Sequence, residues 1–187
     1  MDNSSANRKL TLASVLSSLA LVLVILLRTS LFASARFLEY DPADIPILIG
    51  TLTLGPLWGL AITIIVSGIQ AMTVSAQSGV YGFIMHVIST GTLVTTVALL
   101  YKYLRIKDRI RLVIAVVIGT VIATSVMVGA NLLITPFYMG IAVSKVVELL
   151  VPIIIPFNLI KLGVNSVITM ILFKAIEKYI VIPNRDR

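Results

Sequence analysis

The sequence has no cysteine and a single histidine, His86, so it offers no disulfide, no thiolate nucleophile and no ordinary zinc site. Its apolar runs show no Asp or Glu that would form a proton relay or a coupling-ion site, which argues against autonomous secondary transport. No Ser-His-Asp order and no phosphate-cradling glycine loop is present. We therefore do not expect an enzyme, and we interpret His86 as a hydrogen-bonded packing residue.

Charged residues are also scarce, at 12% of the chain, whereas hydrophobic residues make up 58% and the mean hydropathy is +1.07. A soluble domain is usually about 45–50% apolar and about 25% charged. The apolar residues form continuous runs rather than alternating with polar ones, which indicates membrane helices and not the strands of an outer-membrane barrel. The composition thus predicts an all-α integral membrane protein.

We predict one integral membrane domain, 1–187, that contains six transmembrane helices. Gly55-Pro56 predicts a tight turn, Thr135-Pro136 predicts the end of the fifth helix, and Pro152 and Pro156 predict a break before the sixth. No small-residue cleavage site follows the first apolar run, so we interpret it as a retained span and not as a signal peptide. The predicted spans are about 10–27, 43–54, 57–74, 80–101, 112–134 and 156–180.

The positions of the basic residues, which give the chain a net charge of +7, indicate its orientation in the membrane. Lys and Arg concentrate near the N-terminus, in the link 102–111 and near the C-terminus, whereas few occur in the opposite loops. We therefore predict that both termini are cytoplasmic. The charge does not indicate nucleic-acid binding, because no aromatic-basic module accompanies it.

Polar side chains interrupt the apolar runs near the outer ends of the fifth and sixth helices, at Asn131, Asn158, Lys161 and Asn165. The last three share one helix face, which lipid would not tolerate. They either hold helices together, with Lys161 snorkelling, or bind a ligand. A carboxamide presents a donor and an acceptor side by side, which suits a flat heterocycle with a carbonyl–NH–carbonyl edge. Backbone N–H groups freed at Pro156 would add further donors.

Aromatic residues are frequent in the outer loops 28–41 and 137–145, where they would form an interfacial belt or cover a planar ligand. We interpret Asp41-Pro42 as a turn and Asp44 as part of the N-cap region of the second helix. Ser14 and Ser18 form a small-xxx-small pair in the first helix. This pair would permit close approach either within the bundle or by a partner membrane protein.

Four stretches together resemble the substrate-binding S components of energy-coupling factor (ECF) transporters, specifically the riboflavin type. They are RKLTLASVLSSLALVL, DPADIPILIGTLTLGP, NLLITPFYMG and IIPFNLIKLGVNS. The most specific is the sequence from Pro156 to Lys161, together with Asn131 upstream.

The resemblance implies a multi-pass subunit of a vitamin importer in a prokaryotic cell membrane. Asn131, Asn158 and Lys161 would hold the polar edge of the isoalloxazine ring or the ribityl hydroxyls of riboflavin. Asn165 shares their face, and Tyr40 and Gln70 are further candidates for ligand contact. Riboflavin would be the transported ligand and not a cofactor. FMN would be a further ligand, because the cations Arg36, Lys145 and Lys161 favour a phosphate.

The resemblance also implies partners. Members of the family dock through a small-residue patch on the first helix to a transmembrane coupling protein that two cytoplasmic ATPases drive. Ser14 and Ser18 stand here where an AxxxA pattern is common, and serine is still small enough for docking. Members specific for pantothenate, thiamine or folate share the fold, so another vitamin is an alternative ligand, and a ligand-free membrane scaffold is a further alternative.

Overall fold

Each predicted apolar run forms a helix in the computed structural model, which describes residues 3–32, 35 and 37–179. A two-stranded antiparallel ribbon pairs Thr29 with Tyr40 and Ser30 with Glu39 within the first outer loop. The elements are α1 (Asn3–Leu27), β1 (Thr29–Ser30), β2 (Glu39–Tyr40), α2 (Asp44–Leu54), α3 (Pro56–Met72), α4 (Gly79–Tyr103), α5 (Asp108–Met139), α6 (Val143–Leu149), the π-helical turn η1 (Leu150–Ile154) and α7 (Ile155–Ile176).

Within the described residues, four helical segments are long and apolar enough to cross a membrane: α1, α4, α5 and the continuous run from α6 to α7. The other two predicted spans, α2 and α3, have 11 and 17 residues. At 1.5 Å per residue, 11 residues reach about 16 Å, roughly half of the ~30 Å hydrocarbon core. The described chain is therefore a helical bundle in which α2 is too short to span the membrane.

The short helix α2 lies at the centre of the bundle, where α1, α3, α4 and α7 all contact it. Its residues from Asp44 to Thr53 are all buried, because the sequence is apolar around the whole helix and has no face suited to water. Gly55, with φ 101°, makes the turn into α3. A β-carbon on Gly59 would come 3.0 Å from the Cβ of Thr51, so a glycine is needed for α3 to lie this close to α2.

The predicted end of the fifth helix at Thr135-Pro136 is wrong, because α5 continues through Pro136 to Met139. Proline removes one backbone donor, but this does not stop a helix that is packed along its length against neighbouring helices. The end comes at Gly140, whose φ of 65° is left-handed and whose N–H is donated to the carbonyl of Pro136.

The predicted break before the sixth helix is also absent. α6, η1 and α7 follow one another without interruption, and η1 contains Pro152. A π-helical turn bonds residue i to i+5, so it carries the chain past a proline that cannot supply an ordinary i to i+4 bond. The expectation of a set of freed backbone N–H groups at Pro156 is therefore not supported.

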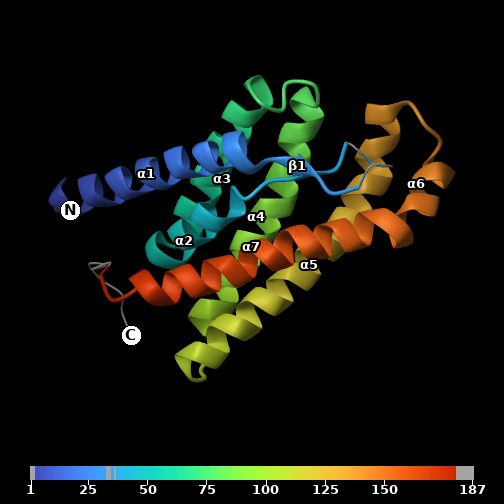
Figure 1. Cartoon of the computed structure of the whole chain (residues 1–187). Helices are drawn as coiled ribbons and strands as arrows, with labels where there is room; N and C mark the ends of the chain where they lie inside the picture. The colour runs from blue at the N-terminus through green and yellow to red at the C-terminus, as the bar shows by residue number, and fades with distance from the viewer. Residues whose placement is uncertain (1–2, 33–34, 36, 180–187) are drawn as a thin grey trace.

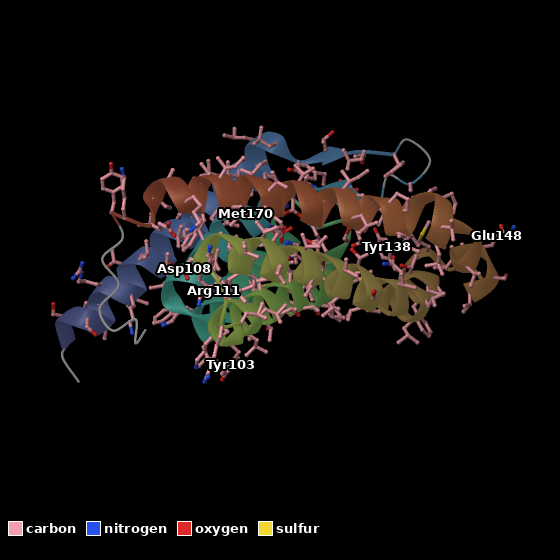
Figure 2. All side chains as sticks on the ribbon, turned by 90° about the horizontal axis from the view of Figure 1, so that it is seen from below. Tyr103, Asp108, Arg111, Tyr138, Glu148 and Met170 are labelled. Carbon is pink, nitrogen blue, oxygen red and sulfur yellow. The ribbon has the colours of Figure 1, made fainter. Side chains whose placement is uncertain are left out.

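The two ends of the bundle are formed by different elements. Figure 1 shows the start of α1 and the end of α7 at the same end, with α6 at the opposite end. Figure 2 places Glu148 of α6 at one end and Asp108 and Arg111, at the start of α5, toward the other.

A separate apolar cluster joins the first outer loop to the α6–α7 run; it includes Ala35, Leu38, Val146, Ile154 and Phe157.

Candidate ligand-binding site

A cavity of about 130 Å³ opens between α3, α4, α5, α7 and the loop that leads into α2. This is smaller than the usual small-molecule pocket of about 300–1,000 Å³, so a ligand of vitamin size requires the side chains of the lining to move apart. Of the residues predicted to bind a ligand, Gln70, Asn131, Asn158 and Lys161 line this cavity. Four residues from three helices, α3, α5 and α7, are thus brought to one place.

Asn131 on α5 and Asn158 on α7 are buried, at 0% and 2% exposure. Each amide nitrogen donates one hydrogen bond to the carbonyl four residues earlier in its own helix, at 2.8 Å from Met127 and from Ile154 respectively. The Oδ1 of Asn131 also accepts a bond from Thr135 at 2.9 Å. An amide can make four hydrogen bonds, so both side chains keep capacity for a group in the cavity.

Lys161 does not snorkel, because its side chain is buried against the loop before α2. Its Nζ donates to Oδ2 of Asp41 at 3.0 Å, and the two side chains are 8% and 10% exposed. Asp41 also accepts the backbone N–H of Ala43 at 3.1 Å, which agrees with the predicted turn at this position. Burial alone would raise the pKa of Asp41, but Lys161 and then His86 outweigh it and hold the pKa well below its usual range.

Asn165 and Tyr40 bond to each other and lie outside the cavity lining. Asn165 donates its amide hydrogens to the carbonyl of Asp41 and to Oδ2 of Asp44, both at 2.9 Å. Its Oδ1 accepts the hydroxyl of Tyr40 at 2.7 Å. Burial, followed by the charges of Asp44 and Asp41, raises the pKa of Tyr40, which keeps this hydroxyl a donor. Both residues therefore join α7 to the loop and to α2.

Asp44 lies in the first turn of α2, in the N-cap region as predicted, but its side chain does not cap the helix. The N-cap position is Ala43 and no side chain caps the helix. The Asp44 carboxylate, fully buried, instead accepts the hydroxyl of Thr90 on α4 at 2.5 Å as well as the Asn165 amide. Asp41 and Asp44 are thus two buried carboxylates inside the bundle, which the sequence analysis did not anticipate.

His86 is buried, as expected of a packing residue, but it also lines the cavity. Its Nδ1 lies 2.6 Å from the hydroxyl of Ser67, whose own hydrogen is donated to the carbonyl of Thr63. The Nε2 faces Asp41 at 3.6 Å and Asp44 at 4.0 Å, distances too long for good hydrogen bonds. No group of three His, Asp or Glu side chains suited to a metal occurs in the described part of the chain.

The aromatic residues of the outer loops divide between several roles. Phe37 and Tyr138 line the cavity, together with Tyr81, Phe83 and Phe157 from the helices. Figure 2 labels Tyr138 near the α6 end of α5, and its ring centroid is 5.5 Å from that of Tyr81. Phe32 packs in the apolar cluster beside α6, and Phe137 is 79% exposed.

Of the two described cations that were expected to favour a phosphate, Lys161 lines the cavity and Lys145 does not. Lys145 pairs with Glu148 on the exposed surface of α6, and Arg36 lies outside the described residues. Lys161 pairs with Asp41. A further cation of the lining, Arg28 at the end of α1, forms an ion pair with Glu39 of β2. Sequence reasoning missed this pair, although both residues lie in the charged loop that it identified.

Ser14 and Ser18 are both exposed on α1. The buried face of the same helix is formed by other residues, including Ala13, Leu16 and Ala20. The reading in which the two serines pack within the bundle is therefore wrong for this structure, and they lie on a surface that a partner can reach.

Comparisons with known proteins show the family to which the chain is related. Residues 8–173 match the family described as "ECF transporter, substrate-specific component". The chain is 29% identical over 181 residues to the riboflavin transporter FmnP of Bacillus subtilis (strain 168), which covers 92% of this chain and 94% of that protein. The fold is similar to a solved S component of a bacterial ECF transporter, with a TM-score of 0.81 and 25% identity over 94% of this chain and 99% of the other.

The family consists of transporter components that bind a substrate, and not of enzymes. Its match includes all or most of every helix and every described residue of the cavity lining. This chain therefore belongs to the family of substrate-specific components of ECF transporters, a family of multi-pass membrane proteins.

Proposed function

We propose that this protein captures riboflavin from outside a prokaryotic cell and delivers it to an ATPase-driven coupling module. The observation that carries the proposal is the cavity itself, which buried carboxamides on α5 and α7 line together with aromatic side chains. The similarity to the riboflavin transporter FmnP supports the choice of vitamin.

The chemistry of the lining suits an isoalloxazine ring. Such a ring is flat and apolar along most of its length, and it carries a carbonyl–NH–carbonyl edge at one end. Phe37, Tyr81 and Phe157 supply aromatic surface, while Asn131 and Asn158 supply donors and acceptors for the polar edge. An apolar cavity with a few converging polar groups is the usual form of a small-molecule site.

The charge of the lining favours riboflavin over FMN. Of the lining residues that the structure describes, the two Lys or Arg side chains, Arg28 and Lys161, each pair with a carboxylate, Glu39 and Asp41. A phosphate at either place would have to displace a carboxylate or lie beside it, which is electrostatically unfavourable.

The orientation and the partners complete the proposal. Lys and Arg are concentrated near the two termini and in the link 102–111, which by the positive-inside rule would be cytoplasmic. The cavity, bounded by the loop before α2 and the α6 ends of α5 and α7, would then open outward. The exposed small-residue surface at Ser14 and Ser18 would dock to the transmembrane coupling protein, which two cytoplasmic ATPases would drive.

The test is ligand binding by the purified full-length protein without ATP. An absorbance spectrum after purification in mild detergent would show flavin bands that persist on washing. Titration calorimetry would then compare riboflavin, FMN, pantothenate, thiamine and folate. Binding of riboflavin alone, or most tightly, supports the proposal. If the protein binds pantothenate, thiamine or folate and no flavin, that vitamin is the substrate in place of riboflavin. If none of the compounds binds or stabilises the protein, the scaffold alternative is favoured.

A further inference from the structure

Four polar side chains from α3 and α4 form a group in the cavity lining, whereas the amides come from α5 and α7. Ser67 and Gln70 are three residues apart on α3, and His86 and Ser89 are three residues apart on α4, so each pair occupies adjacent turns of one helix face. All four are buried and all four line the cavity. The bond between Ser67 and His86 holds the two pairs together.

Two atoms of this group have unused hydrogen-bonding capacity. Gln70 Nε2 and His86 Nε2 are buried side-chain nitrogens without a hydrogen-bond partner in the described structure. Gln70 is 5% exposed and His86 9%. Leaving such a group unpaired is costly, so both nitrogens are expected to gain a partner when the cavity is filled.

We propose that this group, Ser67, Gln70, His86 and Ser89, is a polyol subsite that binds the hydroxylated side chain of the ligand, whereas Asn131 on α5 and Asn158 on α7 bind its ring. The inference rests on the proposed function, because it requires a ligand that carries both a ring and a polyol.

The chemistry of the group matches hydroxyls better than it matches a planar amide edge. Serine, glutamine and imidazole side chains both donate and accept, and a hydroxyl does the same through one rotatable O–H. The gap of 3.6 Å between His86 Nε2 and Asp41 Oδ1 is too long for a direct bond. The Ser67 oxygen, whose hydrogen is donated to Thr63, accepts from Nδ1–H of His86, which leaves Nε2 as an acceptor. A ligand hydroxyl on the cavity side would therefore donate its hydrogen to Nε2 at about 2.8 Å.

The experiment measures the binding of two flavins to the wild type and to three variants. Riboflavin and lumiflavin share the ring, but lumiflavin carries a methyl group in place of the ribityl chain. Their dissociation constants would be measured by flavin fluorescence quenching on the purified full-length wild type, Gln70→Met, Ser89→Ala and Asn158→Leu. The Gln70→Met change keeps side-chain length and removes the amide, and Ser89→Ala is a second variant that alters the subsite with a smaller change in volume.

We expect the wild type to bind riboflavin more tightly than lumiflavin. Gln70→Met should weaken riboflavin binding about tenfold, which is the effect of losing roughly one hydrogen bond to a buried group. The dissociation constant of lumiflavin should stay nearly unchanged. Ser89→Ala should show the same selectivity with a smaller factor, whereas Asn158→Leu should weaken both flavins by the same factor.

Two results would overturn the subsite while flavin binding stands: equal affinity of the wild type for both flavins, or equal losses for both in Gln70→Met and Ser89→Ala. If the wild type binds neither flavin, the proposed function fails and the subsite fails with it. The two failures are therefore distinguishable in one set of titrations.

Discussion

Lys161 on α7 and Asp41 in the loop before α2 form a buried ion pair across 120 residues of sequence, with Nζ 3.0 Å from Oδ2. Asn165, one turn further along α7, adds a bond from its amide to the carbonyl of the same Asp41. The wall of the cavity is thus joined to its loop by a charge pair and a neutral bond. Lys161 contacts the cavity as well, so one residue links the ligand site to the packing of the bundle.

Lys161→Met should destabilise the protein, because it leaves the Asp41 carboxylate buried without its cation. Breaking a buried pair in this way costs about 3–5 kcal/mol. Lys174→Met is the matched control, since Lys174 lies on the same helix and pairs with Glu177, but both side chains are about one-third exposed. That pair should contribute less than about 1 kcal/mol. Reversible unfolding in detergent would compare the variants, and equal losses would contradict the buried role of Lys161.

The double variant Lys161→Met/Asp41→Leu provides a further check. Removal of both charges should recover part of the stability lost in Lys161→Met, because the Asp41 carboxylate is then no longer buried without its cation. A double variant less stable than Lys161→Met would indicate that Asp41 acts mainly through its bond to the Ala43 N–H.

Asn158→Leu and Asn131→Leu should each weaken riboflavin binding by about 1–3 kcal/mol, the cost of losing a hydrogen bond to a buried group. Melting of the ligand-free Asn158→Leu variant should change little, since the helix carbonyl that this amide contacts already accepts a backbone bond. Asn131→Leu should lower the melting temperature more, because it also removes the acceptor of the buried Thr135 hydroxyl. Ser125→Ala is the control, because Ser125 lies on α5 at an exposed position and bonds only the carbonyl of Val121 in the described structure. Unchanged affinity in both asparagine variants would remove the amides from the site.

Glu39→Gln should raise the affinity for FMN relative to riboflavin. The change removes the carboxylate that pairs with Arg28 at the cavity wall, so the guanidinium becomes available to a phosphate. Glu148→Gln is the matched control, since Glu148 pairs with Lys145 on α6, away from the lining. Titration of both flavins on each variant would test this. If the ratio of the FMN affinity to the riboflavin affinity is the same in Glu39→Gln as in the wild type, the phosphate does not approach Arg28.

Gly59→Ala should destabilise the bundle by about 1–3 kcal/mol, the usual effect of overpacking. The new methyl group would meet the side chain of Thr51 and push α3 away from α2. Gly129→Ala is the control, because a β-carbon there has no neighbour within 4 Å, and alanine favours a helix more than glycine. Melting temperatures of the two variants should therefore change in opposite directions or differ clearly, and equal stability would contradict the close contact of α2 with α3.

Ser14→Phe with Ser18→Phe should abolish association with the coupling protein while riboflavin binding by the isolated protein stays unchanged. Both serines are exposed on α1, where small side chains permit the close approach of another helix. Leu19→Phe is the control, since Leu19 is also exposed on α1 but is already large. Co-purification with the coupling module would provide the readout, and retention of the complex in the serine variant would place the docking surface elsewhere.

Much of the bundle could be predicted from the sequence because each helix is a separate apolar run with polar or glycine–proline links. The shared face of Asn158, Lys161 and Asn165 was also predictable, since it depends only on helical spacing. The prolines misled the prediction at Pro136 and Pro152. Local propensity treats proline as a helix end, but packing along the whole helix and a π-helical turn kept both segments helical.

The candidate site, like the fold, could be predicted from the sequence only in part. The sequence by itself determined that the chain forms membrane helices and that a few polar residues must face inward, because lipid excludes charge and amides wherever they occur. Only the tertiary structure decided which polar groups pair. Asp41 meets Lys161, Asp44 meets Thr90 and Asn165, and Arg28 meets Glu39, while Gln70 Nε2 and His86 Nε2 stay unpaired in the cavity wall. Pairing depends on distances between segments far apart in the chain, and no local pattern of residues specifies those distances.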